Sequence, residues 1–324
     1  MPARPSVVIV CPKEFKFTDH AATVERPHLS DVAELSTAWL DFDAPFPASV
    51  IDAHALILWH GPLVTAPVIA QLKNCRAIIR NGVGFDSVDV AAAAKAGIPV
   101  CNVPDYGTEE VADHAIALIL ALYRQLFPLD AVAKKLAWHI DVAPKMRRLR
   151  TQTLGLVGLG RIGTAAALRA KAFGFRVVFY DPYAPAGTHK AVGIERVNSL
   201  AELLKIADTV SVHCPLSAET RSLIGEKEIA QMKPGSFLVN TARGDVVDKA
   251  PVFAALHSGH LAGAGLDVVE NEPLRTAEEA ATPNLICTCH AAFCSPEGMI
   301  EMRSTSAKIA RAAVLGEKVW NRVN

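Results

Sequence analysis

The sequence lacks features that would place it in several specialised classes of protein. None of its seven cysteines forms a Cys-x-x-Cys pair, so neither a metal site nor a redox-active dithiol is expected. Lysine plus arginine and aspartate plus glutamate number 33 each. A chain without net charge has no general attraction for nucleic acid or for a membrane surface. A local positive site for a small anionic substrate remains open.

Long apolar segments are also missing. The longest helical apolar segment, around residues 115–123, has roughly half the length that spans a bilayer. No signal peptide is visible after Met1, and there are no internal repeats or low-complexity segments. We therefore expect a soluble, cytoplasmic protein. Its 324 residues are enough for two domains.

Two alternations of apolar strands and helices follow one another along the chain. In the first, buried parallel strands are predicted at residues 6–11, 55–59, 77–80 and 98–101, with helices at 66–72 and 88–96. A long helix that opens at Thr108 is then predicted to end near Pro128. The polar and basic residues 134–150 are interpreted as a connection.

The second alternation is more regular. Strands are predicted at residues 154–158, 175–181, 209–214, 236–240, 263–268 and 284–287. Helices fill most of the gaps between them, as two mononucleotide-binding halves require. An amphipathic helix at residues 296–314 can return to the first domain. The whole pattern predicts an α/β protein.

A glycine-rich turn opens the second alternation. Gly158, Gly160 and Gly163 form a G-x-G-x-x-G motif between a predicted strand and a predicted helix at residues 161–173. Such a turn presents backbone N–H groups and the positive end of a helix to a pyrophosphate. The next strand ends at Asp181, 23 residues after Gly158. A carboxylate there binds ribose hydroxyls and repels a 2′-phosphate, so the motif predicts NAD rather than NADP.

Three polar residues share one topological position. Arg243, Glu272 and His290 each follow a predicted strand of the second alternation, and the carboxyl ends of parallel strands share one edge. Arginine can hold a carboxylate and polarise a carbonyl, histidine can deliver a proton, and a paired glutamate raises the pKa of a histidine. Each residue singly could be a surface or loop residue. Together they indicate hydride transfer to a 2-oxo acid.

The first alternation offers candidates for substrate binding. Arg80, Val83 and Gly84 lie in a turn-rich segment after a predicted strand. Its backbone N–H groups could bind a carboxylate, although a simple strand-to-helix turn explains the spacing equally well. Trp59, next to His60, and Phe293 would favour a small or apolar substituent if they line the pocket.

These motifs resemble the D-isomer-specific 2-hydroxyacid dehydrogenase family over nearly the whole chain. The most specific segments are residues 156–163, 213–216, 240–244 and 266–273. The resemblance implies two Rossmann-like domains with doubly wound parallel sheets. The substrate-binding domain, flavodoxin-like, takes residues 1–104 and is completed by the C-terminal helix in 296–324. The NAD-binding domain takes residues 105–295.

The resemblance also implies roles for individual residues. Arg243 binds the substrate, a small 2-oxo acid, His290 is the acid/base, and Glu272 is its partner. The cofactor is NAD, and a homodimer forms through the NAD-binding domains. Cofactor contacts are implied at Gly158, Gly160, Arg161, Ile162, Gly163, Asp181, His213, Cys214, Pro215, Thr241, Ala242 and Asp267.

One branch of the family, the C-terminal-binding-protein corepressors, is especially similar over residues 82–86, 168–175, 284–293 and 300–303. In those corepressors a tryptophan stands in place of Phe293, a proline in place of Cys289 and a glycine in place of Asp245. An NAD-responsive scaffold with weak dehydrogenase activity is therefore the alternative function. In formate-type dehydrogenases a glutamine takes the place of the acidic partner of the histidine, so Glu272 argues against that type of enzyme. In phosphoglycerate dehydrogenases the segment that corresponds to residues 58–62 carries arginines. This segment has none, which argues against a phosphorylated substrate.

Overall fold

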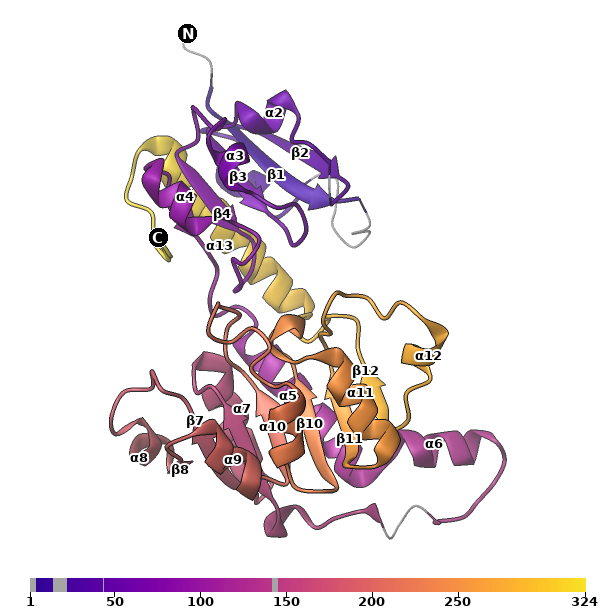
Figure 1. The fold of residues 1–324 in the computed structure, drawn as a ribbon. Coiled ribbons are helices and arrows are strands. Elements are labelled where there is room, and N and C mark those ends of the chain that lie inside the picture. Colours follow the sequence, from indigo (N-terminus) through magenta and orange to yellow (C-terminus); the bar gives the residue numbers. More distant parts are fainter. Residues whose placement is uncertain (1–3, 14–21, 43, 142–144) are drawn as a thin grey trace. The chain divides into compact units, whose positions relative to one another are not determined.

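The computed structural model describes residues 4–13, 22–42, 44–141 and 145–324. The chain divides into two compact units (Figure 1). One comprises Met1–Gly107 with Cys294–Asn324, and the other comprises Thr108–Phe293. These limits lie within three residues of the expected domain limits. Each unit contains a parallel sheet with helices on both faces, the architecture that alternating strands and helices predict.

The first unit has a five-stranded parallel sheet in the order β2-β1-β3-β4-β5. Its strands are β1 (Ser6–Pro12), β2 (Glu34–Leu40), β3 (Ala55–Leu58), β4 (Ala77–Arg80) and β5 (Val100–Cys101). This is the flavodoxin-like order, and the predicted fold class is confirmed. The sequence did not predict β2, because it is an edge strand with partly exposed residues rather than a continuous buried segment.

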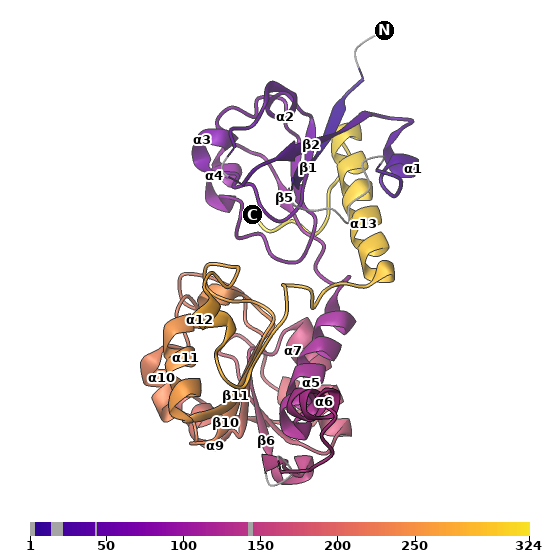
Figure 2. The ribbon, with the colours of Figure 1, turned by 90° about the vertical axis from the view of Figure 1, so that its right-hand side faces the viewer.

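Helices cover both faces of this sheet (Figure 2). One face carries α2 (Ala48–Ile51), α3 (Ala66–Ile69) and α4 (Val90–Lys95), and the other carries α1 (Arg26–Leu29) and α13 (Pro296–Leu315). The long α13 packs on β3, β4 and α1. Its Arg303 donates two hydrogen bonds to the buried carboxylate of Glu25. The C-terminal helix therefore completes the first unit, as predicted.

The second unit has a seven-stranded parallel sheet in the order β12-β11-β10-β9-β6-β7-β8. Its strands are β6 (Thr153–Val157), β7 (Arg176–Tyr180), β8 (Glu195–Arg196), β9 (Thr209–Val212), β10 (Ser236–Asn240), β11 (Leu261–Leu266) and β12 (Leu285–Cys287). The strand order reverses between β6 and β9, which is where doubly wound sheets bind nucleotides. Of the strands that the structure describes in this unit, the two-residue edge strand β8 is the one that was not predicted.

The helices of the second unit form two layers (Figure 2). On one face lie α5 (Thr108–Arg124) and α7 (Arg161–Ala172), and on the other lie α9 (Leu200–Ile206), α10 (Glu226–Gln231) and α11 (Lys249–Ser258). The short helices are α8 (Thr188–Val192), α12 (Ala277–Ala280), and the 3-10 turns η2 (Leu149–Thr151) and η3 (Gly244–Val246). Gly265 lets α5 approach β11, because a Cβ there would lie 3.0 Å from the Leu118 Cβ.

The helix that opens at Thr108 ends at Arg124, not near Pro128 as predicted. Gln125 has a left-handed backbone (φ 53), and α6 (Leu126–Lys134) begins at once. Pro128 lies in the first turn of α6, where a missing N–H costs no helical hydrogen bond. No single helix among the described residues is long and apolar enough to cross a membrane. The pair α5 and α6 would be by length and composition, but it is bent by 62°.

Candidate active site

The glycine-rich turn lies tightly against the loop that follows β9. Gly158 has φ 96, and a Cβ on it would lie 2.8 Å from the backbone nitrogen of Cys214. A Cβ on Gly163 would lie 2.4 Å from the carbonyl oxygen of Gly158. At both positions any other residue would collide with backbone.

Gly160 differs from these two glycines. It is the N-cap residue of α7, and nothing lies within 4 Å of the position that a Cβ would occupy. No side chain caps this helix, so its first N–H groups have no capping acceptor beside the positive end of the helix dipole. This cradle fits a pyrophosphate, which is the group that such helix ends bind.

Asp181 follows β7 and links the turn after that strand to the glycine loop. Its Oδ2 accepts a hydrogen bond from the Leu159 nitrogen at 2.8 Å, and its Oδ1 accepts one from the Tyr183 nitrogen at 2.8 Å. Arg196 in β8 donates to the carbonyl oxygens of Asp181 at 2.9 Å and Ala184 at 3.1 Å. No arginine stands directly after Asp181 in the sequence. Sheet pairing between β7 and β8 instead brings Arg196 to this turn.

The segment His213–Pro215 follows β9 beside the glycine loop and is uncharged. Burial lowers the pKa of His213 to about 4 and raises the pKa of the Cys214 thiol to about 11. The His213 Nε2 lies 2.9 Å from the Ser211 hydroxyl. Among the described residues, its buried Nδ1 has no hydrogen-bond partner. This segment can contact a cofactor through packing and dipoles, but carries no charge toward it.

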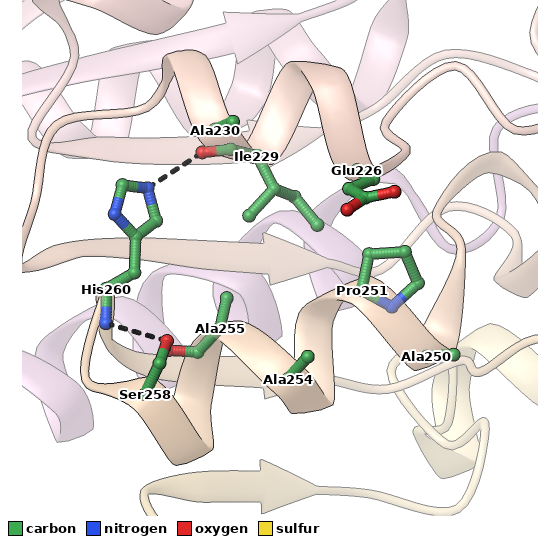
Figure 3. A pocket seen from close by; sticks show the side chains of 9 residues that line it. All are labelled: Glu226, Ile229, Ala230, Ala250, Pro251, Ala254, Ala255, Ser258 and His260. Carbon is green, nitrogen blue, oxygen red and sulfur yellow. Dashed lines mark hydrogen bonds between the residues drawn. The ribbon is translucent and has the colours of Figure 1, made fainter.

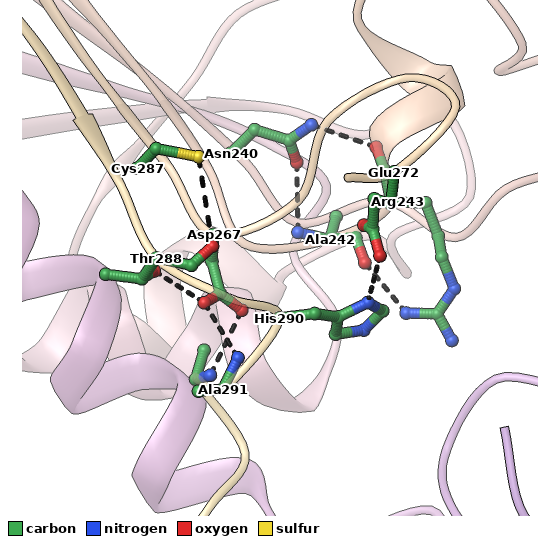
Figure 4. Close-up of polar contacts among 10 residues, drawn as sticks. Asn240, Ala242, Arg243, Asp267, Glu272, Cys287, Thr288, His290 and Ala291 are labelled. Atoms are coloured by element: carbon green, nitrogen blue, oxygen red, sulfur yellow. Dashed lines mark hydrogen bonds and ion pairs between the residues drawn. The ribbon is translucent and has the colours of Figure 1, made fainter. Parts of the chain in front are cut away.

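The loop that carries Arg243 is shaped by a buried side chain, Asn240 (Figure 4). The Asn240 Oδ1 accepts from the Ala242 nitrogen at 3.0 Å, and its Nδ2 donates to the Arg243 carbonyl oxygen at 2.9 Å. A Cβ on Gly244 would lie 2.1 Å from the carbonyl oxygen of Val269. The Arg243 loop is therefore pressed against the segment that leads to Glu272. Asn240 was recognised only as part of a motif, and its role becomes visible with its contacts.

Glu272 and His290 form a pair at the same edge of the sheet. The Glu272 Oε2 lies 2.9 Å from the His290 Nδ1, and the side chains are 33% and 26% exposed. A carboxylate only accepts, so Nδ1 carries the proton of this hydrogen bond. A proton exchanged with a substrate then passes through Nε2. Figure 4 shows the Arg243 guanidinium extending on the same side of these loops as the His290 ring.

Two further residues surround His290. The Phe293 ring meets the imidazole edge to face, with ring centres 6.3 Å apart. Asp267, which follows β11, is 3% exposed, and its carboxylate accepts hydrogen bonds from the Ala291 and Ala292 nitrogens at 2.9 and 3.0 Å. Asp267 was expected to contact the cofactor. In the structure its carboxylate also organises the loop that carries His290.

The candidate substrate residues of the first unit follow two adjacent strands. Trp59 and His60 follow β3, and Trp59 is 3% exposed. Arg80 ends β4, and its buried guanidinium donates to the carbonyl oxygen of the next residue. The Val83 carbonyl oxygen accepts from the Asn102 side chain at 2.7 Å. The segment with Val83 and Gly84 is thus a turn fixed by its own unit.

A groove of about 690 Å³ between α10 and α11 contains none of the expected site residues (Figure 3). Small residues such as Ala230 and Ala254 line much of it. At its edge, His260 Nε2 bonds the Ile229 carbonyl oxygen at 2.9 Å. A histidine used in this way holds one element against another, and we assign no chemistry to this groove.

The chain is similar to several known proteins. Residues 116–292 match the family model for the NAD-binding domain of D-isomer specific 2-hydroxyacid dehydrogenases. C-terminal-binding protein 1 of Caenorhabditis elegans is 33% identical over 314 residues, covering 91% of this chain and 42% of that protein. D-3-phosphoglycerate dehydrogenase of Methanocaldococcus jannaschii is 37% identical over 273 residues, covering 84% and 52%. The chain thus spans about half the length of these curated relatives.

A solved structure extends the similarity to nearly the whole chain. D-lactate dehydrogenase from Aquifex aeolicus, complexed with NAD and lactic acid, superposes with a TM-score of 0.84 at 30% identity. The match covers 95% of this chain and 96% of that one. With the family model covering more than half of the residues, the chain belongs to the D-isomer-specific 2-hydroxyacid dehydrogenase family.

Proposed function

We propose that the protein is an NAD-dependent D-2-hydroxyacid dehydrogenase that interconverts a small 2-oxo acid and its 2-hydroxy acid. The observation that carries the proposal is the hydrogen-bonded pair Glu272–His290, 33% and 26% exposed, at the sheet edge that also bears the open glycine loop. A related D-lactate dehydrogenase that was solved with NAD and lactic acid supports this reaction class.

The second unit is proposed to bind NAD. The backbone around Gly160 and the start of α7 would hold the pyrophosphate, and Asp181 the adenosine ribose. When bound, NADH would supply the hydride for reduction of the 2-oxo acid, and NAD⁺ would accept a hydride in the reverse reaction. Further contacts are proposed for Arg161, Ile162, His213, Cys214, Pro215, Thr241, Ala242 and Asp267.

Residues of the chain are proposed to bind the 2-oxo acid and to transfer the proton that forms its hydroxyl group. In the reduction, Arg243 holds the carboxylate and polarises the 2-oxo group through its fixed, permanently charged guanidinium. His290 gives the proton on Nε2 to the oxygen that becomes the hydroxyl group. Glu272, through its 2.9 Å hydrogen bond to Nδ1, keeps the ring oriented during proton transfer.

The first unit is proposed to supply the other wall of the substrate pocket. The segment of Arg80, Val83 and Gly84 would offer backbone N–H groups to the carboxylate. Trp59, His60 and Phe293 are proposed as further lining of the pocket. Aromatic lining favours a small or apolar substituent over a phosphorylated one.

The test is a panel of glyoxylate, hydroxypyruvate, phenylpyruvate and 3-phosphohydroxypyruvate with NADH, followed by the decrease in NADH absorbance. Turnover of one of the unphosphorylated acids is expected. A clear preference for the phosphorylated acid would contradict the pocket assignment and leave the reaction class intact. Absence of turnover with every acid in both directions would contradict the reaction class.

The similarity to C-terminal-binding protein 1 over 91% of the chain favours a second candidate, an NAD-responsive scaffold with weak dehydrogenase activity. Fold similarity alone does not decide function. The two functions are distinguished by their turnover rates. A scaffold would bind NADH normally but turn over every acid of the panel slowly. An enzyme would reach a turnover number within the ordinary range, about 1–10³ per second, with one of them.

We also propose that a second copy of the chain covers the segment from α6 to residue 141. No residue of α6 is buried, and α6 and the segment after it project from their own unit in Figure 1. Leu136, Trp138 and Ile140 are 98%, 95% and 73% exposed, and exposed apolar patches mark interfaces. A symmetric dimer through the NAD-binding units would bury both copies of this segment at once.

Sedimentation velocity tests the dimer. The doubly substituted variant Leu136→Asp/Trp138→Asp should sediment as a monomer at concentrations where the unchanged protein is a dimer. Leu168→Asp is the matched control, because Leu168 on α7 is also exposed, at 52%, and lies outside the segment. A monomeric unchanged protein, or equal dissociation in the control, would contradict the proposal.

A further inference from the structure

The loop that carries His290 is fixed by a polar network that reaches α5. The carboxylate of Asp267, only 3% exposed, accepts a hydrogen bond from the Thr288 hydroxyl at 2.6 Å. On its other side, the same hydroxyl lies 3.0 Å from the His114 Nε2. The three residues lie 21 or more positions apart in sequence. They meet where α5 passes the carboxyl ends of β11 and β12.

The direction of each hydrogen bond follows from counting protons. A carboxylate only accepts, so the single proton of the Thr288 hydroxyl points to Asp267. The hydroxyl oxygen therefore accepts from His114, and the His114 Nε2 must carry a hydrogen. The distance from that nitrogen to the Asp267 Oδ1 is 3.8 Å, too long for a direct hydrogen bond. His114 thus acts on the carboxylate mainly through Thr288.

The backbone of the His290 loop hangs on the same aspartate. Both carboxylate oxygens receive loop N–H groups, from Ala291 and Ala292. The backbone carbonyl oxygen of Asp267 accepts a hydrogen bond from the His290 backbone nitrogen at 2.8 Å. His290 itself has a left-handed backbone, φ 52, which costs a non-glycine residue free energy unless the surroundings hold it. The network supplies that constraint.

The position of His114 follows from the packing of α5. Leu118 and Leu122, one and two turns further along the same helix face, fill the space above Gly265 and Gly263 of β11. His114 therefore reaches the end of this strand, where Asp267 begins the loop. A close helix-to-strand contact, made possible by two glycines, sets the distance between His114 and Thr288.

We propose that His114 is a positioning residue for the reaction and that it acts on His290 through Thr288 and Asp267. The inference rests on the proposed function for its kinetic consequences, but not for its structural ones. His114 touches neither reacting atom. It holds the Thr288 hydroxyl toward Asp267, so that Asp267 keeps the His290 loop in its strained conformation. Small displacements of a catalytic group can lower a rate about a hundredfold.

Steady-state kinetics with the 2-oxo acid that the panel selects measures the effect. Thr288→Val should lower kcat about tenfold to a hundredfold, and Thr288→Ser should restore it. His114→Phe should lower kcat about fivefold, as expected for one lost hydrogen bond, and His114→Gln, which keeps a donor, should recover most of the rate. The KM of the acid and the Kd of NADH should change less than about twofold.

The double variant His114→Phe/Thr288→Val separates a relay from two independent contacts. Because His114 acts through Thr288, the double variant should be no slower than Thr288→Val alone. Multiplying losses would overturn the proposal, as would losses confined to KM. Asp113→Asn is the matched control on the same turn of α5. Asp113 is exposed and pairs with Arg169, so that its kcat should stay unchanged.

Hydrogen–deuterium exchange provides a readout that needs no turnover. The amides of His290, Ala291 and Ala292 should exchange faster in His114→Phe and Thr288→Val, and at the original rate in His114→Gln and Asp113→Asn. Unchanged protection in His114→Phe and Thr288→Val would overturn the positioning role whatever the activity. Faster exchange in a protein that turns over no acid would instead contradict the proposed function and leave the positioning role standing.

Discussion

The two sheets of the molecule have the same parallel architecture but carry different residues at the ends of their strands. In each unit, an arginine at a strand end donates to a neighbouring backbone carbonyl oxygen, Arg80 to that of Asn81 and Arg243 to that of Ala242. In the second unit, the residues after β10, β11 and β12 include a guanidinium, a carboxylate and an imidazole, and the last two form a 2.9 Å pair. Chemistry is therefore set by the loops at the strand ends rather than by the fold.

The difference extends to how charge is used in each unit. Among the described residues of the first unit, the most buried ion pair joins Arg303 to Glu25, with side chains 11% and 1% exposed. It joins α13 to the residue that precedes α1. In the second unit, Glu272 and His290 stay accessible and are themselves held by buried neighbours. Substitutions in the buried pair of the first unit should therefore lower stability. Substitutions at the sheet edge of the second unit should lower turnover.

The largest expected effect is on turnover. Arg243→Gln removes the charge proposed to hold the substrate carboxylate and polarise its carbonyl, so kcat/KM for the 2-oxo acid should fall about a hundredfold to a thousandfold. The Kd of NADH, from the quenching or transfer of protein fluorescence, should change little because the glycine loop and Asp181 are untouched. Unchanged turnover would remove Arg243 from the site. Lost NADH binding would mean that the loop itself had collapsed.

The second expected effect is on folding. Arg303→Met leaves the carboxylate of Glu25 buried without its partner, which typically costs about 3–5 kcal/mol. Three of the four tryptophans, at positions 39, 59 and 320, belong to the first unit. Urea unfolding followed by tryptophan fluorescence should therefore show a lower midpoint for this variant.

The control for this variant lies on the same helix. Arg311 pairs with Asp31, but the side chains are 36% and 62% exposed, and water replaces such contacts readily. Arg311→Met should shift the unfolding midpoint far less than Arg303→Met. Equal shifts would show that α13 is held mainly by its apolar face.

Local sequence patterns predicted the parts of the fold that depend on near neighbours. Strands buried on both faces, such as β4 and β10, are continuous apolar segments, and their predicted limits were confirmed. Two of the four edge strands, β2 and β8, are partly exposed or very short and give no such segment. The helix α6 follows a single left-handed residue, Gln125, which no hydrophobic periodicity reveals.

The candidate site was predictable to the same extent. Arg243, Glu272 and His290 could be assigned to one edge, because topology fixes where the ends of parallel strands lie. The residues that hold them could not, since their roles depend on tertiary contacts. His114 meets Thr288 across 174 positions, and Arg196 meets Asp181 across 15. Asp267 was expected to contact NAD, and that contact stays a prediction.

The smallest expected effect concerns the choice of cofactor. Asp181→Asn removes the charge that would repel a 2′-phosphate and keeps an acceptor for the Leu159 nitrogen, now bonded at 2.8 Å. Arg196, which already donates to the carbonyl oxygen of Asp181, would then be the nearest cation to that phosphate. The ratio of kcat/KM with NADPH to that with NADH should rise about tenfold, or about 1.4 kcal/mol.

Adding Arg196→Met to Asp181→Asn distinguishes the two contributions. If Arg196 assists a 2′-phosphate once the carboxylate is neutral, the double variant should lose much of the gain with NADPH while its kcat/KM with NADH stays near that of Asp181→Asn. An unchanged cofactor ratio in Asp181→Asn would mean that the ribose does not lie against this carboxylate. The recognition of NAD would then depend on the glycine loop alone. The second unit would select its cofactor by the shape of its backbone instead of by charge.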